Sequence, residues 1–133
     1  MKKRKILVFG IIILLVIILI LIRTFSYGGE DNWIKDSKGV YVKHGNPSNT
    51  PDYVKEQQIA IEKAQELFQN EKNSGANFSS QCLGTTGDYA VDIVHVPRTS
   101  EDNLPANQCA DYADGKVGHF IELDKEGNIV RIM

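Results

Sequence analysis

The stretch "DYAVDIVHVPRTSEDNLPANQC", residues 88–109, runs from an apolar segment into a polar one and ends at one of only two cysteines in the chain. Its first part alternates between the two faces of an extended strand, with Tyr89, Val91 and Ile93 on one side. This alternation predicts a strand over residues 89–96. The polar remainder, which contains two prolines, predicts an exposed connection.

The connection carries the residues with which we expect the protein to recognise a partner: Arg98, Glu101, Asp102 and Asn103. A long polar connection is costly to order unless its surface is used. Its two prolines limit the freedom that would be lost on binding. The alternative, a connection that only joins two strands, stays open at the level of sequence.

Polar side chains in and around the same stretch define a second alternative, an enzyme whose site is assembled across the sheet from Asp92, His95, Arg98 and His119. Asp92 and His95 cannot pair along the strand, because residues an odd number apart face opposite sides of a sheet. Such a site would therefore need partners from other strands. An enzyme also needs two of these groups to converge in a concave pocket.

The flanking sequence predicts an α+β domain over residues 50–133. Apolar residues recur every three or four positions from Val54 to Phe68, which indicates an amphipathic helix capped by Thr50 and ended at residues 73–75. Alternation of period two predicts three further strands: Phe78–Leu83, His119–Leu123 and Ile129–Met133. We expect four antiparallel strands, the last two forming a hairpin, with the helix packed on one face of the sheet.

The order of one helix followed by strands, ending in "ELDKEGNIVRI", resembles the PepSY and cystatin-like arrangement. In that arrangement a helix is wrapped by a meander of strands. The resemblance covers the helix and the strands of the expected domain. It implies a binding or inhibitory module outside the membrane.

The amino-terminal segment, residues 1–23, predicts a membrane anchor. Residues 6–22 are apolar without interruption except for Gly10, and they lack the polar stripe of a core helix. The run lies at the short end of what spans a bilayer, and Arg23 can snorkel to extend it. The basic residues 2–5 favour a cytoplasmic amino terminus with the rest outside. No small-residue cleavage site follows, so we expect an uncleaved, single-pass anchor in the cell membrane.

Residues 24–49 are predicted to form a juxtamembrane hairpin and a linker. Two short extended segments, Trp33–Lys35 and Val40–Lys43, flank a turn, and "GNPSNTP" follows. The stretch "NWIKDSKGVYVKHGNPS" resembles a juxtamembrane pattern of small uncharacterised envelope proteins of archaea and uncultured bacteria. The resemblance implies an anchored, exported protein and names no activity. Those proteins often have a cysteine near the position of Lys35, and this chain does not.

Cys82 and Cys109 are predicted to form a disulfide, because they are the only pair and both lie on the side expected to be exported. The alternative is a reactive thiol. A reactive thiol needs a positioned base or a helix amino terminus, and the local sequences "SSQCLG" and "NQCADY" supply neither.

Charge and histidine spacing exclude several classes of partner. Five of the 15 basic residues lie at or before Arg23, which leaves ten against 17 acidic residues and a net charge of about −7 beyond it. That charge disfavours nucleic acid and anionic lipid surfaces. His44, His95 and His119 stand alone, without the paired spacing of a zinc site. We expect no metal and no cofactor.

These observations favour a membrane-tethered interaction module whose exported domain binds a protein, a peptide or another envelope component. An accessory subunit of a membrane complex is the first alternative. An extracytoplasmic enzyme is the second.

Overall fold

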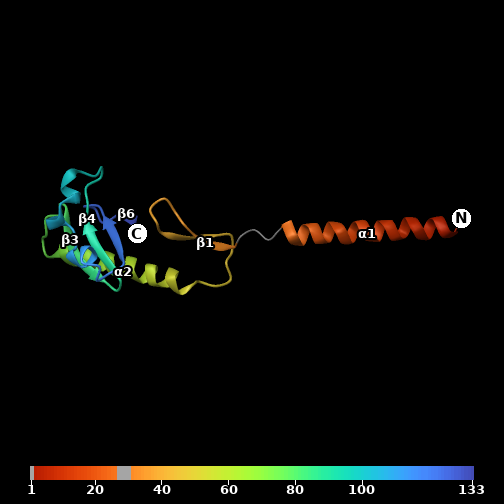
Figure 1. The fold of residues 1–133 in the computed structure, drawn as a ribbon, viewed down its shortest axis with the longest axis horizontal. Coiled ribbons are helices and arrows are strands. Elements are labelled where there is room, and N and C mark those ends of the chain that lie inside the picture. Colours follow the sequence, from red (N-terminus) through yellow and green to blue (C-terminus); the bar gives the residue numbers. More distant parts are fainter. Residues whose placement is uncertain (1, 27–30) are drawn as a thin grey trace.

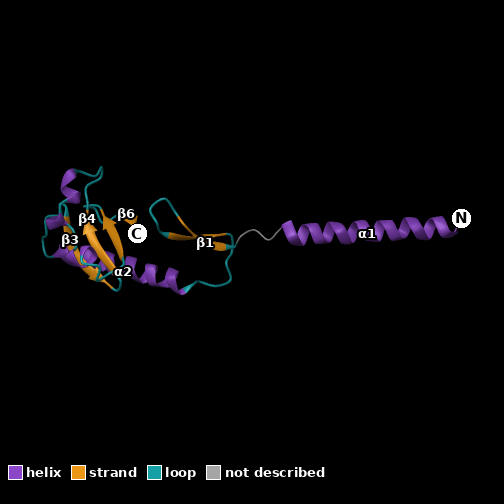
Figure 2. Ribbon diagram, in the orientation of Figure 1, coloured by secondary structure: helices purple, strands orange, loops and turns teal. Residues whose placement is uncertain are grey.

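A computed structural model shows the backbone of residues 2–26 and 31–133, with side chains described for residues 10–22 and 31–133 (Figure 1). The elements follow one another along the chain as α1 (Lys2–Ser26), β1 (Asn32–Lys35), β2 (Tyr41–His44), α2 (Asp52–Asn73), β3 (Gln81–Thr86), β4 (Tyr89–Ile93), the 3₁₀ helices η1 (Ser100–Asn103) and η2 (Pro105–Asn107), α3 (Ala110–Ala113), β5 (His119–Leu123) and β6 (Ile129–Ile132). The expected α+β class is confirmed (Figure 2).

The first helix, α1, has 25 residues, and Figure 1 shows it apart from the sheets. Every residue from Ile11 to Ile22 is a large apolar one that exposes at least 41% of its surface. Within the part of the chain that the structure describes, no helix was found that is both long and apolar enough to cross a membrane. The side chains of residues 6–9 lie outside the described part of the chain, so the membrane span expected over residues 6–22 stays a prediction.

The main sheet has the order β3-β4-β5-β6, and its central pair is parallel. The outer pairs, β3 with β4 and β5 with β6, are antiparallel as expected. The prediction of four antiparallel strands was therefore wrong for β4 and β5. Parallel neighbours cannot be joined by a tight turn, so the chain must cross over between them. Residues 94–118, with η1, η2 and α3, form this crossover.

Five of the six strands that the structure describes have bounds that differ from the predicted ones, and the differences are largest for β3 and β4. The third strand begins at Gln81 rather than at Phe78, because Phe78 packs on Phe68 of α2 with ring centroids 4.5 Å apart. Its apolar character therefore indicates burial in the core and not a strand. The fourth strand ends at Ile93 rather than at residue 96, because the chain turns away there and His95 donates its backbone N–H to Asp102.

Helix α2 packs on one face of the main sheet, as predicted. Its N-cap is Pro51 and not Thr50, and no side chain caps it. One face of the helix is buried, at spacings of three and four residues: Val54, Gln57, Ala60, Ala64 and Phe68. The two alanines allow the helix to approach the apolar side chains of Val91, Ile121 and Leu123 closely, and these form the core.

The hairpin of β1 and β2 is fastened to the domain that follows it. The buried amide of Gln57 accepts the N–H of Tyr41 at 2.8 Å and donates to the carbonyl of Gly39 at 2.9 Å. The carbonyl of Lys38 accepts the N–H of Ile132 at 2.7 Å. The hairpin turn thus completes one end of the sheet, and these contacts cross the boundary expected at residue 50.

Candidate functional site

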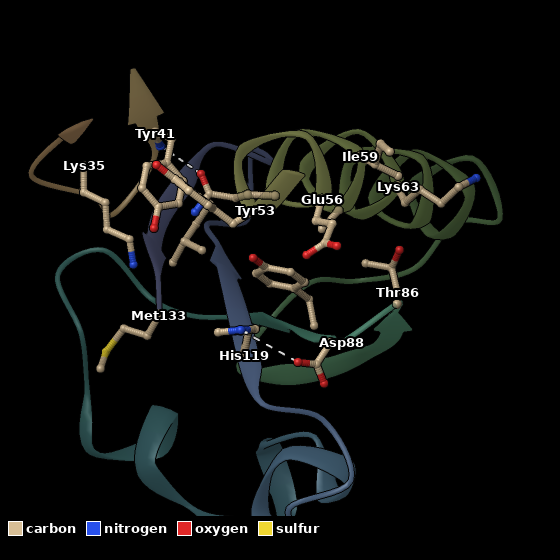
Figure 3. A pocket seen from close by; sticks show the side chains of 15 residues that line it. Lys35, Tyr41, Tyr53, Glu56, Ile59, Lys63, Thr86, Asp88, His119 and Met133 are labelled. Atoms are coloured by element: carbon tan, nitrogen blue, oxygen red, sulfur yellow. Dashed lines mark hydrogen bonds and ion pairs between the residues drawn. The ribbon is translucent and has the colours of Figure 1, made fainter. Parts of the chain in front are cut away.

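A cavity of about 590 Å³ lies between the amino-terminal half of α2, the hairpin and the adjoining ends of β4 and β5 (Figure 3). Aromatic rings form much of its lining. Tyr41 and Tyr53 have ring centroids 4.9 Å apart, and Tyr89 stacks on the imidazole of His119, also at 4.9 Å. Tyr89 and His119 are register partners in the parallel pair. The crossover topology is therefore what places these two rings side by side.

Charged side chains of both signs surround the cavity: Lys35, Glu56, Lys63 and Asp88. Figure 3 shows Glu56 directed from α2 toward the cavity and Lys63 pointing away from it. Asp88 is held in place, because its Oδ1 accepts the N–H of Gly118 at 2.7 Å and its Oδ2 lies 3.7 Å from Nε2 of His119. The rim therefore has no dominant sign of charge.

The phenol of Tyr89 keeps its proton at neutral pH. Burial raises its pKa above the ordinary value, and the nearby Tyr41, Glu56 and Asp88 raise it further. A protonated phenol can donate a hydrogen bond as well as accept one. Tyr89 is 9% exposed, and its ring together with those of Tyr41 and Tyr53 gives the cavity an aromatic lining that carries phenol hydroxyl groups.

The four residues expected to recognise a partner lie in two different environments. Asp102 is buried, and Arg98 pairs with the carboxylate of Glu122 and donates to Oδ1 of Asn103. Glu101 and Asn103 are exposed. Three of the four side chains, those of Arg98, Asp102 and Asn103, are thus engaged within the protein, and Glu101 is exposed to solvent.

The carboxylate of Asp102 stabilises the first turn of the crossover. It accepts the backbone N–H of Thr99 at 2.6 Å and that of His95 at 3.0 Å, and it lies 2.9 Å from Nδ1 of His95. Burial alone would raise the pKa of this carboxyl. The hydrogen bonds from Thr99 and His95 outweigh burial and hold the pKa well below its ordinary value.

A second buried carboxylate, Glu122, lies on the face of the sheet opposite α2. Its oxygens accept from Nε of Arg131 at 3.1 Å and from Nη2 at 3.0 Å, and they also pair with Arg98. Arg98 thereby ties the crossover to β5. This is a structural role that the sequence did not indicate.

The four groups of the enzyme alternative have separate partners. His95 follows the carboxyl end of β4, beside a second cavity of about 470 Å³, whereas His119 begins β5 and lines the first cavity. Asp92 accepts the N–H of Cys109 at 2.9 Å, and Arg98 pairs with Glu122. The two histidines therefore lie at opposite ends of the parallel pair.

The disulfide between Cys82 and Cys109 is confirmed. It joins β3 to the residue that precedes α3 within the crossover, so the polar part of the connection is held covalently to the sheet edge. The carboxylate of Asp92 and the two sulfurs lie within 4.8 Å of one another. Because the sulfurs are bonded to each other, neither is a thiolate that could ligate a metal.

No family model, curated protein or solved structure matches the chain. The expected likeness to PepSY and cystatin-like domains, and that to small envelope proteins, stay predictions.

The aromatic cavity was not predicted from the sequence. Its lining comes from the hairpin, α2, the turn between β3 and β4, and the strands β4, β5 and β6. No motif of fixed spacing joins these segments. The available signal was compositional, since tyrosines at positions 41, 53 and 89 lie at or near the start of predicted elements.

Proposed function

We propose that this protein is a single-pass membrane protein whose exported domain binds a partner protein, and that it acts by binding rather than by catalysis. The cavity beside α2 receives an apolar or aromatic side chain of the partner. The observation that carries the proposal is the aromatic cavity with a rim of mixed charge. Interfaces between proteins are built in this way, with aromatic anchors at the centre and polar groups around them.

Exposed apolar side chains extend the cavity into a surface. Tyr53 exposes 48%, Ile59 56% and Met133 54% of their area. All three line the cavity. A partner that inserted one side chain would therefore also cover these neighbours and remove apolar area from water.

The anchor is proposed from the sequence of residues 6–22 together with the exposed residues of α1. A helix that exposes apolar side chains on all sides is unfavourable in water, and a bilayer would cover them. The basic residues 2–5 favour a cytoplasmic amino terminus by the positive-inside rule. The acidic remainder then faces outward, where it binds proteins rather than nucleic acid.

Site-specific photo-crosslinking in native membranes tests the binding surface. A photoreactive phenylalanine analogue placed at Tyr53 of the full chain should give a covalent adduct with one partner protein. The same analogue at Gln69, an exposed residue in the carboxyl-terminal half of α2, is the matched control and should give none.

Ile59→Asp supplies the second arm, since it puts a charge among the exposed apolar side chains of the cavity without touching the core. This substitution should reduce the adduct formed at position 53 at least tenfold. Equal adducts at positions 53 and 69, or an adduct insensitive to Ile59→Asp, would contradict the proposed surface.

A further inference from the structure

The two sulfurs of the disulfide differ in access. Cys82 lies on β3 at the edge of the sheet and is exposed, whereas Cys109 is 2% exposed. An external thiolate must reach a sulfur along the direction of the bond that breaks. Of the two residues, Cys82 is the one that solvent reaches, and attack there makes Cys109 the sulfur that departs.

The departing sulfur would carry a charge in a place that disfavours it. Sγ of Cys109 lies 3.3 Å from the carbonyl oxygen of Gly84 and 3.4 Å from that of Val91. Both oxygens repel a thiolate and would accept a hydrogen bond from a thiol. Burial also raises the cost of the anion. Departure of this sulfur is thus favoured only if it gains a proton.

Asp92 is placed to give that proton. Its carboxylate comes from β4, lies on the same face of the sheet as Cys109, and is within 4.8 Å of both sulfurs. Its Oδ1 accepts the backbone N–H of Cys109 at 2.9 Å, which fixes the carboxyl beside that residue. The sequence did not predict this proton donor, because the pairing of β4 with β3 is what brings Asp92 beside the disulfide.

We infer that the disulfide is a thiol–disulfide exchange site, in which an external thiolate attacks Cys82 and Asp92 protonates the departing sulfur of Cys109. The thiolate forms a bond to Sγ of Cys82 as the bond between the two sulfurs breaks. The bonding electrons pass to Sγ of Cys109, and the proton moves from Asp92 to it. The products are a mixed disulfide at Cys82, a thiol at Cys109 and the carboxylate of Asp92, so atoms and charge balance.

The charges that face Asp92 come from two elements. Glu122 of β5 is its register partner and raises its pKa, whereas Arg98 of the crossover lowers it. Arg131 of β6 is bound to Glu122 and partly neutralises it. Burial is the largest influence and raises the pKa, the hydrogen bond from Cys109 opposes it, and together with these charges they bring the pKa of Asp92 to about 6. The protonated form is therefore populated under mildly acidic conditions.

Reaction of the folded full chain with 2-mercaptoethanol tests this assignment. This thiol is small, and at a given pH it is ionised to the same extent whichever protein variant it reacts with. The reaction is quenched with a thiol-alkylating reagent, and the modified peptides are identified by mass spectrometry. The mixed disulfide should appear on Cys82 and the alkyl group on Cys109. The rate constant, expressed per thiolate, should fall as pH rises through about 6, as Asp92 loses its proton.

Asp92→Asn should lower that rate constant at pH 5 on the order of tenfold and remove its dependence on pH. Glu71→Gln, at an exposed carboxylate of α2, is the matched control and should react like the unaltered chain. Thermal unfolding of both variants verifies that they are folded. Mixed disulfide on Cys109, an unchanged rate for Asp92→Asn, or no reaction unless the protein is unfolded would each overturn the inference in favour of a purely structural disulfide.

Discussion

Asp92 and Asp102 show how the surroundings of a carboxyl set its pKa in opposite directions. Asp102 is the more deeply buried, yet hydrogen bonds from Thr99 and His95 hold its pKa low. Asp92 accepts one backbone hydrogen bond, from Cys109, and burial raises its pKa to about 6. At Asp102 the hydrogen bonds to the charged form outweigh burial, whereas at Asp92 burial outweighs the single hydrogen bond.

The raised pKa of Asp92 predicts how stability depends on pH. The folded state holds the proton more tightly than the unfolded chain, so Asp92 destabilises the fold as pH rises from about 4 to about 6. Asp92→Asn, whose Oδ1 still accepts the N–H of Cys109, should therefore stabilise the protein at pH 7 by about 1–2 kcal/mol, allowing for its partial exposure to solvent.

The measurement is thermal unfolding of both proteins followed by near-ultraviolet circular dichroism at pH 7 and at pH 4. The gain in Tm should be present at pH 7 and should vanish near pH 4. An equal gain at both values would show that Asp92 keeps an ordinary pKa in the folded state.

At the scale of elements, the sequence predicts the features that depend on residues close together in the chain. The turn of the last hairpin is closed by Asp124, whose Oδ1 accepts the N–H groups of Glu126 and Asn128. The helix and the two faces of β4 likewise follow from the period of apolar residues. Alternation says which face of a strand is buried, but it does not say which strand lies beside it. The parallel pairing of β4 with β5 could therefore not be predicted.

The candidate sites, too, could be predicted only in part from the sequence. The disulfide could be predicted, because the chain offers one pair of cysteines. The ion pair of Arg98 and the internal hydrogen bonds of Asp102 could not be predicted, since a charged residue in a polar stretch usually faces solvent. The aromatic cavity depends on the register between Tyr89 and His119, and that register exists only after the crossover has formed.

The last hairpin and α2 meet at Gly127, and this contact gives a second prediction. Gly127 has φ +89°, and a Cβ there would lie 2.6 Å from the ring of Phe68, which is fully buried and stacked on Phe78. Gly127→Ala should lower the free energy of unfolding by about 2–4 kcal/mol, from the positive φ and from displacement of the ring.

Gly75→Ala is the matched control for this substitution. Gly75 has nearly the same φ, +84°, but a Cβ there meets nothing within 4 Å. It should cost about 1–2 kcal/mol, the backbone contribution alone. Urea unfolding of the two variants measures the difference, and equal losses would mean that the hairpin does not pack on Phe68 in solution.

At the scale of the whole molecule, the chain divides into an apolar helix and an acidic α+β domain with a hairpin between them. The hairpin is bound to the domain through Gln57 and Lys38, so the cavity includes residues from both. An exported binding module requires that the helix lie in a membrane and that the domain face outward.

The most direct test of this proposal is the accessibility of the two ends of the full chain to a protease added to intact cells. The chain carries one epitope tag at each end for this purpose. The proposal predicts that the carboxyl-terminal tag is removed while the amino-terminal tag is retained in the membrane fraction. A carboxyl-terminal tag that survives in intact cells and is cleaved only after lysis would contradict it.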